Sequence, residues 1–291
     1  MEHKRRRWAG VLCSCASLVV GCGDVLGPGA LLDAGPVDVD AALVPARDAA
    51  LQPGMDGRLD APLARDSSRA DTGAAGCGAA NVVTRAFFES IFPASGRNPV
   101  FTYDGFVHAA SAYPDFIGSG DLDTCRKEAA AFLANVSHET DNLRYSEQIA
   151  KERYCSPSGG CPCDQATSDQ TKWYYGRGAL QLSWNYNYCA AGSALGADLL
   201  NTPSLVSTDQ DLVWRTAIWF WMRGGVTSCH GQMQPGGGGM GGTIRTINGG
   251  LECDKGGYGA QPGVTQRVMR YLDFARRLGI ANPGTPQDND C

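Results

Sequence analysis

Two glutamates, Glu139 and Glu147, lie eight residues apart in the segment SHETDNLRYSEQ that begins at Ser137. A pair of carboxyl groups is the minimum apparatus for hydrolysing a glycosidic bond, because one protonates the leaving oxygen and the other activates water. For inversion the two groups should be about 6.5–9.5 Å apart, whereas eight residues of helix advance about 12 Å. The chain must therefore turn between them.

The residues before Glu139 predict a helix over Arg126–Thr140. Its apolar face is set at helical spacing by Ala129, Phe132, Leu133 and Val136. Glu139 follows Phe132 by seven residues and falls on the same face. A carboxyl group pressed against apolar neighbours is harder to ionise than one in water, as a general acid requires. Glu139 is therefore the predicted general acid.

Asp141 and Asn142 provide the expected stop to this helix, since both compete for backbone hydrogen bonds and Asn tolerates the left-handed conformation. Glu147 would then return on a loop as the general base. Glu152 is the competing candidate, because it lies nearer Tyr154 and Cys155.

Five sequence blocks carry a resemblance to a known family. They are SHET, YCSP, the run WYYGRGALQLSWNYNY from Trp173, WRTAIWFWM from Trp214 and INGGLEC from Ile247. Together they resemble the glycoside hydrolase family 19 chitinases over roughly Val82 to Cys291. The resemblance implies a mainly α-helical fold of the lysozyme-like superfamily, with two lobes around a cleft. It also implies an endo-chitinase that cleaves β-1,4-linked N-acetylglucosamine with inversion and needs no cofactor or metal.

The same resemblance assigns roles within the site. It implies that Glu139 is the acid, Glu147 the base and Ser183 the residue that helps to hold the attacking water. Substrate contacts or support of the acid-base pair are implied for Gln181, Tyr186, Asn187, Asn248 and Arg267. This chain departs from the common HETGG sequence, with HETDN at the same place.

Other functions compete with a chitinase. Ser183 as a nucleophile would need a nearby base, and QLSWN is not a Gly-x-Ser-x-Gly elbow. A peptidoglycan hydrolase is the main alternative, since both polymers contain N-acetylglucosamine in β-1,4 linkage. A catalytically silent sugar-binding protein is the third. Five aromatic residues have two possible roles, stacking on sugar rings or packing in the core. They are Tyr174, Tyr175, Trp184, Tyr186 and Tyr188.

The first 21 residues have the pattern of an export signal, with a basic head and an apolar stretch of 13 residues that is too short to span a membrane. Val19 to Cys22 resembles a bacterial lipobox, which predicts a lipid-bearing Cys22 at the mature N-terminus. Ordinary secretion, with Cys22 a bystander, is the alternative. We expect an exported protein, either lipid-anchored to a bacterial membrane or secreted.

Residues 22–76 contain nine Asp, twelve Ala and no aromatic residue, so they predict a disordered tether. Residues 77–291 are long enough for one catalytic domain. The net charge of −5 does not support binding to nucleic acid. The expected partner is chitin or a related polysaccharide, bound by a monomer that meets a membrane only through its lipid.

Nine cysteines from Cys77 onward suit an oxidising compartment. The CxC at Cys161 lacks nearby histidines and is weak evidence for zinc, so no metal is expected. Family resemblance implies the pairs Cys155–Cys161 and Cys253–Cys291. The other five cysteines, at least one of them unpaired, cannot be connected from sequence.

Apolar residues recur at helical spacing in four segments, which predicts a helix in each. The segments are Tyr103–Ala112, Arg126–Thr140, Asp211–Met222 and Thr265–Leu278. In the third, Trp214, Ile218 and Trp221 are expected in the core. The glycine-rich run Gly236–Gly242 predicts a mobile loop.

Overall fold

The computed structural model describes residues 76–156 and 161–291. The signal segment, Cys22 and almost all of the expected tether lie outside these residues. The described part is helical and contains isolated β-bridges in place of named strands. No helix in this part is both long and apolar enough to cross a bilayer.

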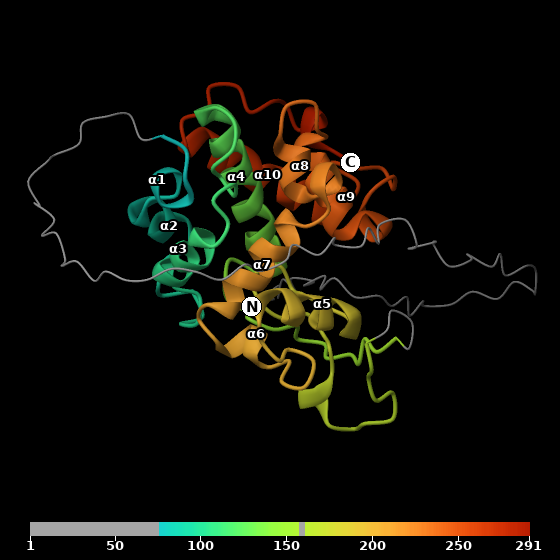
Figure 1. Cartoon of the computed structure of the whole chain (residues 1–291). Coiled ribbons are helices and arrows are strands. Elements are labelled where there is room, and N and C mark those ends of the chain that lie inside the picture. Colours follow the sequence, from blue (N-terminus) through green and yellow to red (C-terminus); the bar gives the residue numbers. More distant parts are fainter. Residues whose placement is uncertain (1–75, 157–160) are drawn as a thin grey trace, which may run out of the picture. The chain divides into compact units, whose positions relative to one another are not determined.

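The α-helices follow the chain order shown in Figure 1. They are α1 (Ala79–Val82), α2 (Arg85–Ile91), α3 (Tyr103–Ser111), α4 (Leu122–Glu139), α5 (Asn185–Leu195), α6 (Leu205–Thr208), α7 (Leu212–Met222), α8 (Cys229–Met233), α9 (Gly239–Glu252) and α10 (Pro262–Arg277). The four helices expected from spacing are confirmed as α3, α4, α7 and α10, with small shifts at their ends.

Helix α4 is the element that carries the first glutamate. Its start is fixed by Asp121, whose Oδ1 accepts the Thr124 backbone N–H at 2.8 Å. The apolar face predicted for this helix is fully buried. Helix α4 packs along α10, so the end of α4 faces side chains from the C-terminal part of the chain.

Two hydrophobic cores underlie the two lobes of the lysozyme-like fold. The larger core is formed mainly by α1–α4 and α7–α10. The smaller one centres on α5 and includes Tyr174, Tyr188 and Leu199. Helix α7 contacts α3, α5, α6 and α8, and its residues Trp214 and Trp221 are fully buried. It therefore joins the lobe of α3 to that of α5.

The expectation of a mobile loop at Gly236–Gly242 is wrong for the second half of this run. Helix α9 begins at Gly239 and includes Met240, which is fully buried. A Cβ added at Gly241 would lie 1.9 Å from the Asp290 carbonyl oxygen. The low helix propensity of glycine is overridden here, because only a residue without a side chain lets the C-terminal tail pack so closely.

Four disulfides connect the described cysteines: Cys77–Cys125, Cys155–Cys163, Cys161–Cys189 and Cys253–Cys291. The pairing of Cys253 with Cys291 agrees with the resemblance. The pairing of Cys155 with Cys161 is wrong, because Cys161 bonds to Cys189 on α5 and leaves Cys163 for Cys155. Cys229 is free and buried, which accounts for the odd number.

Candidate active site

The chain reverses direction directly after Glu139, as the turn argument requires. Asp141, Asn142 and Leu143 have φ values of 49°, 60° and 63°, so three successive residues adopt the left-handed conformation. The Ser137 hydroxyl donates to Asn142 Oδ1 at 2.6 Å and holds the turn against the last turn of α4. The expected stop at Asp141 and Asn142 is confirmed.

Arg267 of α10 organises the surroundings of Glu139. Its side chain is fully buried, and its Nη2 donates to Glu139 Oε1 at 2.5 Å. Nε and Nη2 both donate to the carboxylate of Glu252 at 3.0 Å, and Nη1 donates to Asn135 Oδ1 at 3.0 Å. Asn248 Nδ2 in turn donates to Glu252 Oε1 at 2.8 Å. One guanidinium thus holds two carboxyl groups in a single buried network.

The purely apolar setting expected for the Glu139 carboxyl is therefore wrong. The helix face is apolar along Phe132 and Val136, but the carboxyl end of Glu139 meets the Arg267 guanidinium. Burial, together with the positive charges of Arg267 and Arg270, holds the pKa of His138 well below its usual range. His138 is therefore neutral near pH 7 and adds no positive charge to this network.

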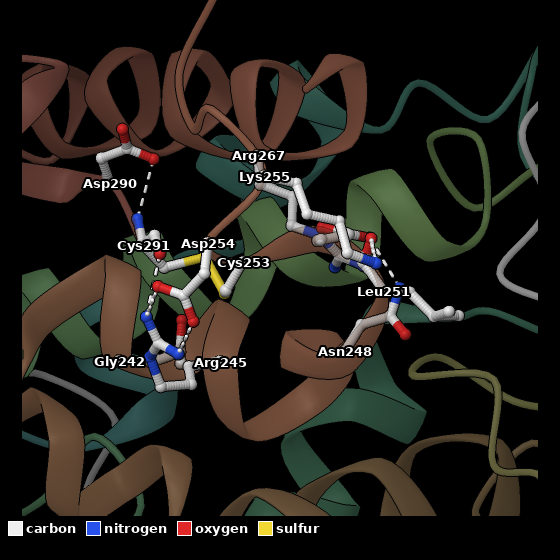
Figure 2. Close-up of a disulfide and its surroundings, with 12 residues drawn as sticks. Gly242, Arg245, Asn248, Leu251, Cys253, Asp254, Lys255, Arg267, Asp290 and Cys291 are labelled. Carbon is white, nitrogen blue, oxygen red and sulfur yellow. Dashed lines mark hydrogen bonds and ion pairs between the residues drawn. A yellow bond between two sulfur atoms is a disulfide. The ribbon is translucent and has the colours of Figure 1, made fainter. Parts of the chain in front are cut away.

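The last turn of α9 is held from outside by the C-terminus. Asn248 has the non-helical angles φ −146° and ψ 27°, which kink the helix before Glu252. Cys253 is bonded to the terminal Cys291, and Arg245 donates to both carboxylate oxygens of Asp254, at 2.7 and 2.9 Å. Figure 2 draws this disulfide together with Asn248 and Arg267 from its surroundings. The tail thus fixes the position of the carboxylate that shares Arg267.

Glu147 belongs to a different network, built by short pairings of extended backbone. Glu147 pairs with Arg177, and Arg177 pairs with Leu182. On either side of Glu147, the Gln148 N–H donates to the Gly176 carbonyl and the Gly178 N–H donates to the Ser146 carbonyl, both at 2.8 Å. The YYGRG motif therefore serves as the backbone partner that fixes the Glu147 loop.

Three side chains approach the Glu147 carboxylate. Lys151 Nζ lies 2.8 Å from Oε1, the Tyr175 hydroxyl donates to Oε2 at 3.2 Å, and Arg177 Nε lies 3.9 Å from Oε2. The Glu147 side chain is 38% exposed and lines an open groove with Tyr145. The Tyr175 and Arg177 contacts tie the Glu147 carboxylate to the YYGRG segment.

Ser183 lies one residue beyond Leu182, which pairs with Arg177. Its hydroxyl donates to the Gln181 carbonyl at 2.9 Å, and its own carbonyl accepts from Asn187 Nδ2 at 2.9 Å. Gln181 adopts the left-handed conformation, with φ 50°. The structure therefore brings Gln181, Ser183 and Asn187 together, beside the strand-like pair that carries Glu147.

The aromatic residues of this region separate into two groups. Tyr174, Tyr175 and Tyr188 are buried, so their rings are closed to a sugar. Trp184 and Tyr186 are each 37% exposed, with ring centroids 5.9 Å apart and planes 17° apart. The Trp184 ring also packs against that of Tyr154, at a centroid distance of 5.0 Å, and both Trp184 and Tyr186 stay partly open to solvent.

Two contributors to the site were missed in the sequence. Glu252 lies inside the INGGLEC block, four residues after Asn248, and that helical spacing was the available signal. Lys151 follows Glu147 by four residues, but a lysine in a loop carries no signal of its own. Glu252 acts through its contact with Arg267 of α10, a segment that periodicity alone does not connect to it.

Two lobes with a buried carboxyl network and a second, half-exposed glutamate define a glycoside hydrolase of the lysozyme-like class. A family model described as chitinase class I, glycoside hydrolase family 19, matches residues 82–291. The chain belongs to this family.

Known relatives agree with this assignment. Chitinase 3 of Oryza sativa subsp. japonica is 37% identical over 240 residues, which cover 71% of this chain and 72% of the relative. A solved bacterial family 19 chitinase is 45% identical, with a TM-score of 0.60 over 70% of this chain and 98% of that one. Inactive chitinase-like protein 1 of Hevea brasiliensis is 39% identical over 247 residues, covering 72% of this chain and 74% of the relative.

Proposed function

We propose that this family 19 endochitinase cleaves β-1,4-linked N-acetylglucosamine polymers with inversion, using Glu139 as general acid and Glu147 as general base. The observation that carries the proposal is the contrast between the two carboxyl groups. Glu139 is 4% exposed on a rigid helix, whereas Glu147 is 38% exposed on a loop among cations. Contrasting environments are how two like residues come to serve as acid and base.

The network around Arg267 supports the role of Glu139. Glu139 and Glu252 together carry two negative charges when both are ionised, and Arg267 supplies one positive charge. A proton held at Glu139 is the one that the leaving oxygen needs. Once it is transferred, Arg267 stabilises the remaining carboxylate.

The surroundings of Glu147 support the role of base. Lys151 and Arg177 lie against the Glu147 carboxylate, and partial exposure gives water access to it. In this proposal the Ser183 hydroxyl helps to hold that water, as the family resemblance implies. Trp184 and Tyr186 offer apolar faces against which a sugar ring can stack.

Parallel assays on chitin oligomers and purified bacterial sacculi test the substrate. We expect cleavage of the oligomers, and loss of that cleavage in Glu139→Gln. Release of muropeptides without chitin cleavage would replace the proposal with a peptidoglycan hydrolase. Tight binding of oligosaccharides without turnover would replace it with a sugar-binding protein.

We further propose that the enzyme is an exported monomer held on a bacterial membrane by acylated Cys22. The support is the lipobox-like sequence Val19 to Cys22 and the Ala/Asp-rich residues 22–76. A flexible coil of 55 residues has an average reach of about 40 Å, which suits attack on an insoluble polymer. Membrane fractionation of wild type and Cys22→Ala is the test. Equal recovery of both in the soluble fraction would favour simple secretion.

A further inference from the structure

Lys151 holds the carboxylate of Glu147 from the solvent side. Its Nζ lies 2.8 Å from Glu147 Oε1 and 5.1 Å from the centre of the Tyr175 ring. Its side chain is 34% exposed. Hydrogen bonds to Glu147 and then to Tyr175 raise the pKa of Lys151, so it stays cationic throughout the neutral range.

We propose that Lys151 is a positioning residue that fixes the orientation of Glu147 for its role as general base. This inference rests on the proposed function, in which Glu147 activates the attacking water.

Two contacts on opposite oxygens are needed to fix the plane of the carboxylate. Oε2 is approached by the Tyr175 hydroxyl at 3.2 Å and by Arg177 Nε at 3.9 Å. Lys151 supplies the only short contact recorded on Oε1 among the described residues. Without Lys151 the carboxylate would pivot about its Oε2 side. Because each carboxylate oxygen has two lone pairs, the lysine leaves Oε1 able to accept a proton from water.

Two cations face Glu147, and Lys151 is the one that is not buried in other contacts. Arg177 is 1% exposed, stacks on Tyr175 at 3.6 Å, and donates to the Trp173 carbonyl and the Tyr188 hydroxyl. Burial raises the pKa of Tyr188, so this residue stays neutral. Removing the Lys151 charge therefore leaves Arg177 as the nearest cation to Glu147, at the longer distance.

Lys151→Met tests the inference, since it keeps a long unbranched side chain, one atom shorter, and removes its charge. Loss of orientation acts on the chemical step more than on binding. With a soluble chitin oligomer we expect kcat to fall about tenfold and KM to stay within about twofold. The acidic limb of the kcat profile should move to higher pH. Lys151→Arg should recover most of the lost rate.

Lys172→Met is the matched control. Lys172 ends the short 3₁₀ helix Gln170–Lys172, and its Nζ donates to the Asn201 carbonyl at 2.8 Å, so this variant also removes an exposed lysine that is held by a hydrogen bond. We expect kcat, KM and the pH profile of wild type.

Three results would overturn the inference. They are wild-type kinetics in Lys151→Met, a rise in kcat in that variant, or a fall that is equal at all pH values and not recovered by Lys151→Arg. Glu147→Gln separates this failure from that of the proposed function. If Glu147→Gln is inactive while Lys151→Met behaves as wild type, only the inference about Lys151 fails. If Glu147→Gln is active, the assignment of the base fails.

Discussion

Glu139 and Glu147 stand eight residues apart in one segment, yet the fold gives them opposite surroundings. Glu139 ends a long buried helix and shares Arg267 with Glu252. Glu147 lies on a loop paired to the YYGRG segment, half open to solvent and faced by Lys151. The difference arises from the three left-handed residues after α4, which divide the segment between two networks.

Because both residues are glutamates, the difference in their expected roles must come from the surroundings of each carboxyl group. The buried network holds two carboxyl groups through one guanidinium, so changes to it should affect both activity and folding. The exposed network is built from loop contacts, so changes to it should affect activity with little effect on folding. The predictions below test this contrast.

Glu139→Gln should produce the largest effect. The substitution keeps the shape of the side chain and removes the transferable proton, so kcat should fall by about 10²–10⁴-fold. Steady-state hydrolysis of a chitin oligomer measures this, with circular dichroism as the check on folding. Glu152→Gln is the matched control and should stay within about twofold of wild type. Loss of activity in Glu152→Gln would move the base to that residue.

Arg267→Met should show that the acid's network also stabilises the fold. It leaves Glu139 and Glu252 buried without their guanidinium, and breaking a buried ion pair costs about 3–5 kcal/mol. Glu147→Gln breaks only a half-exposed pair and should cost about 1 kcal/mol or less. Urea unfolding of both variants measures the difference. Equal losses of unfolding free energy would contradict the contrast between the two networks.

Sequence reasoning predicted the helices well, because the apolar faces of α4, α7 and α10 repeat at helical spacing. It also predicted the turn at Asp141 and Asn142, which depends on local backbone chemistry. It failed where distant segments meet. The start of α9 depends on the tail packed on Gly241, and the buried acid Glu252 depends on Arg267 from another helix.

Two of the disulfides close loops of different length and should therefore stabilise the fold to different extents. Cys253–Cys291 spans 38 residues and Cys155–Cys163 spans 8. Chain entropy predicts stabilisation of about 4 and about 2.5 kcal/mol for loops of these sizes. Replacing each pair by alanines should therefore lower the free energy of unfolding more for Cys253–Cys291. The reverse order would mean that strain or unfolded-state structure outweighs chain entropy.

A smaller, pH-dependent effect is expected at the buried Glu128. Its carboxylate accepts from Trp221 Nε1 at 2.9 Å and lies 2.7 Å from His230 Nδ1. The hydrogen bond to Glu128 raises the pKa of His230. The resulting stabilisation is complete below the unfolded-state pKa of about 6.5, and is lost as pH rises through the folded-state pKa.

Melting temperatures measured between pH 5.5 and 9 test this coupling. Wild type should lose stability with rising pH more steeply than His230→Gln, in which the titrating group is absent. Parallel curves for the two proteins would show that His230 does not contribute to the pH dependence of folding.

The stereochemistry of the first products tests the central claim most directly. If Glu139 donates the proton while Glu147 activates water on the opposite face of the sugar, each cleavage inverts the anomeric carbon. Proton NMR of a chitin oligomer, recorded within the first minutes of hydrolysis, should then show the α-anomer accumulating before mutarotation. Initial accumulation of the β-anomer would contradict the assignment of these two residues as an inverting pair.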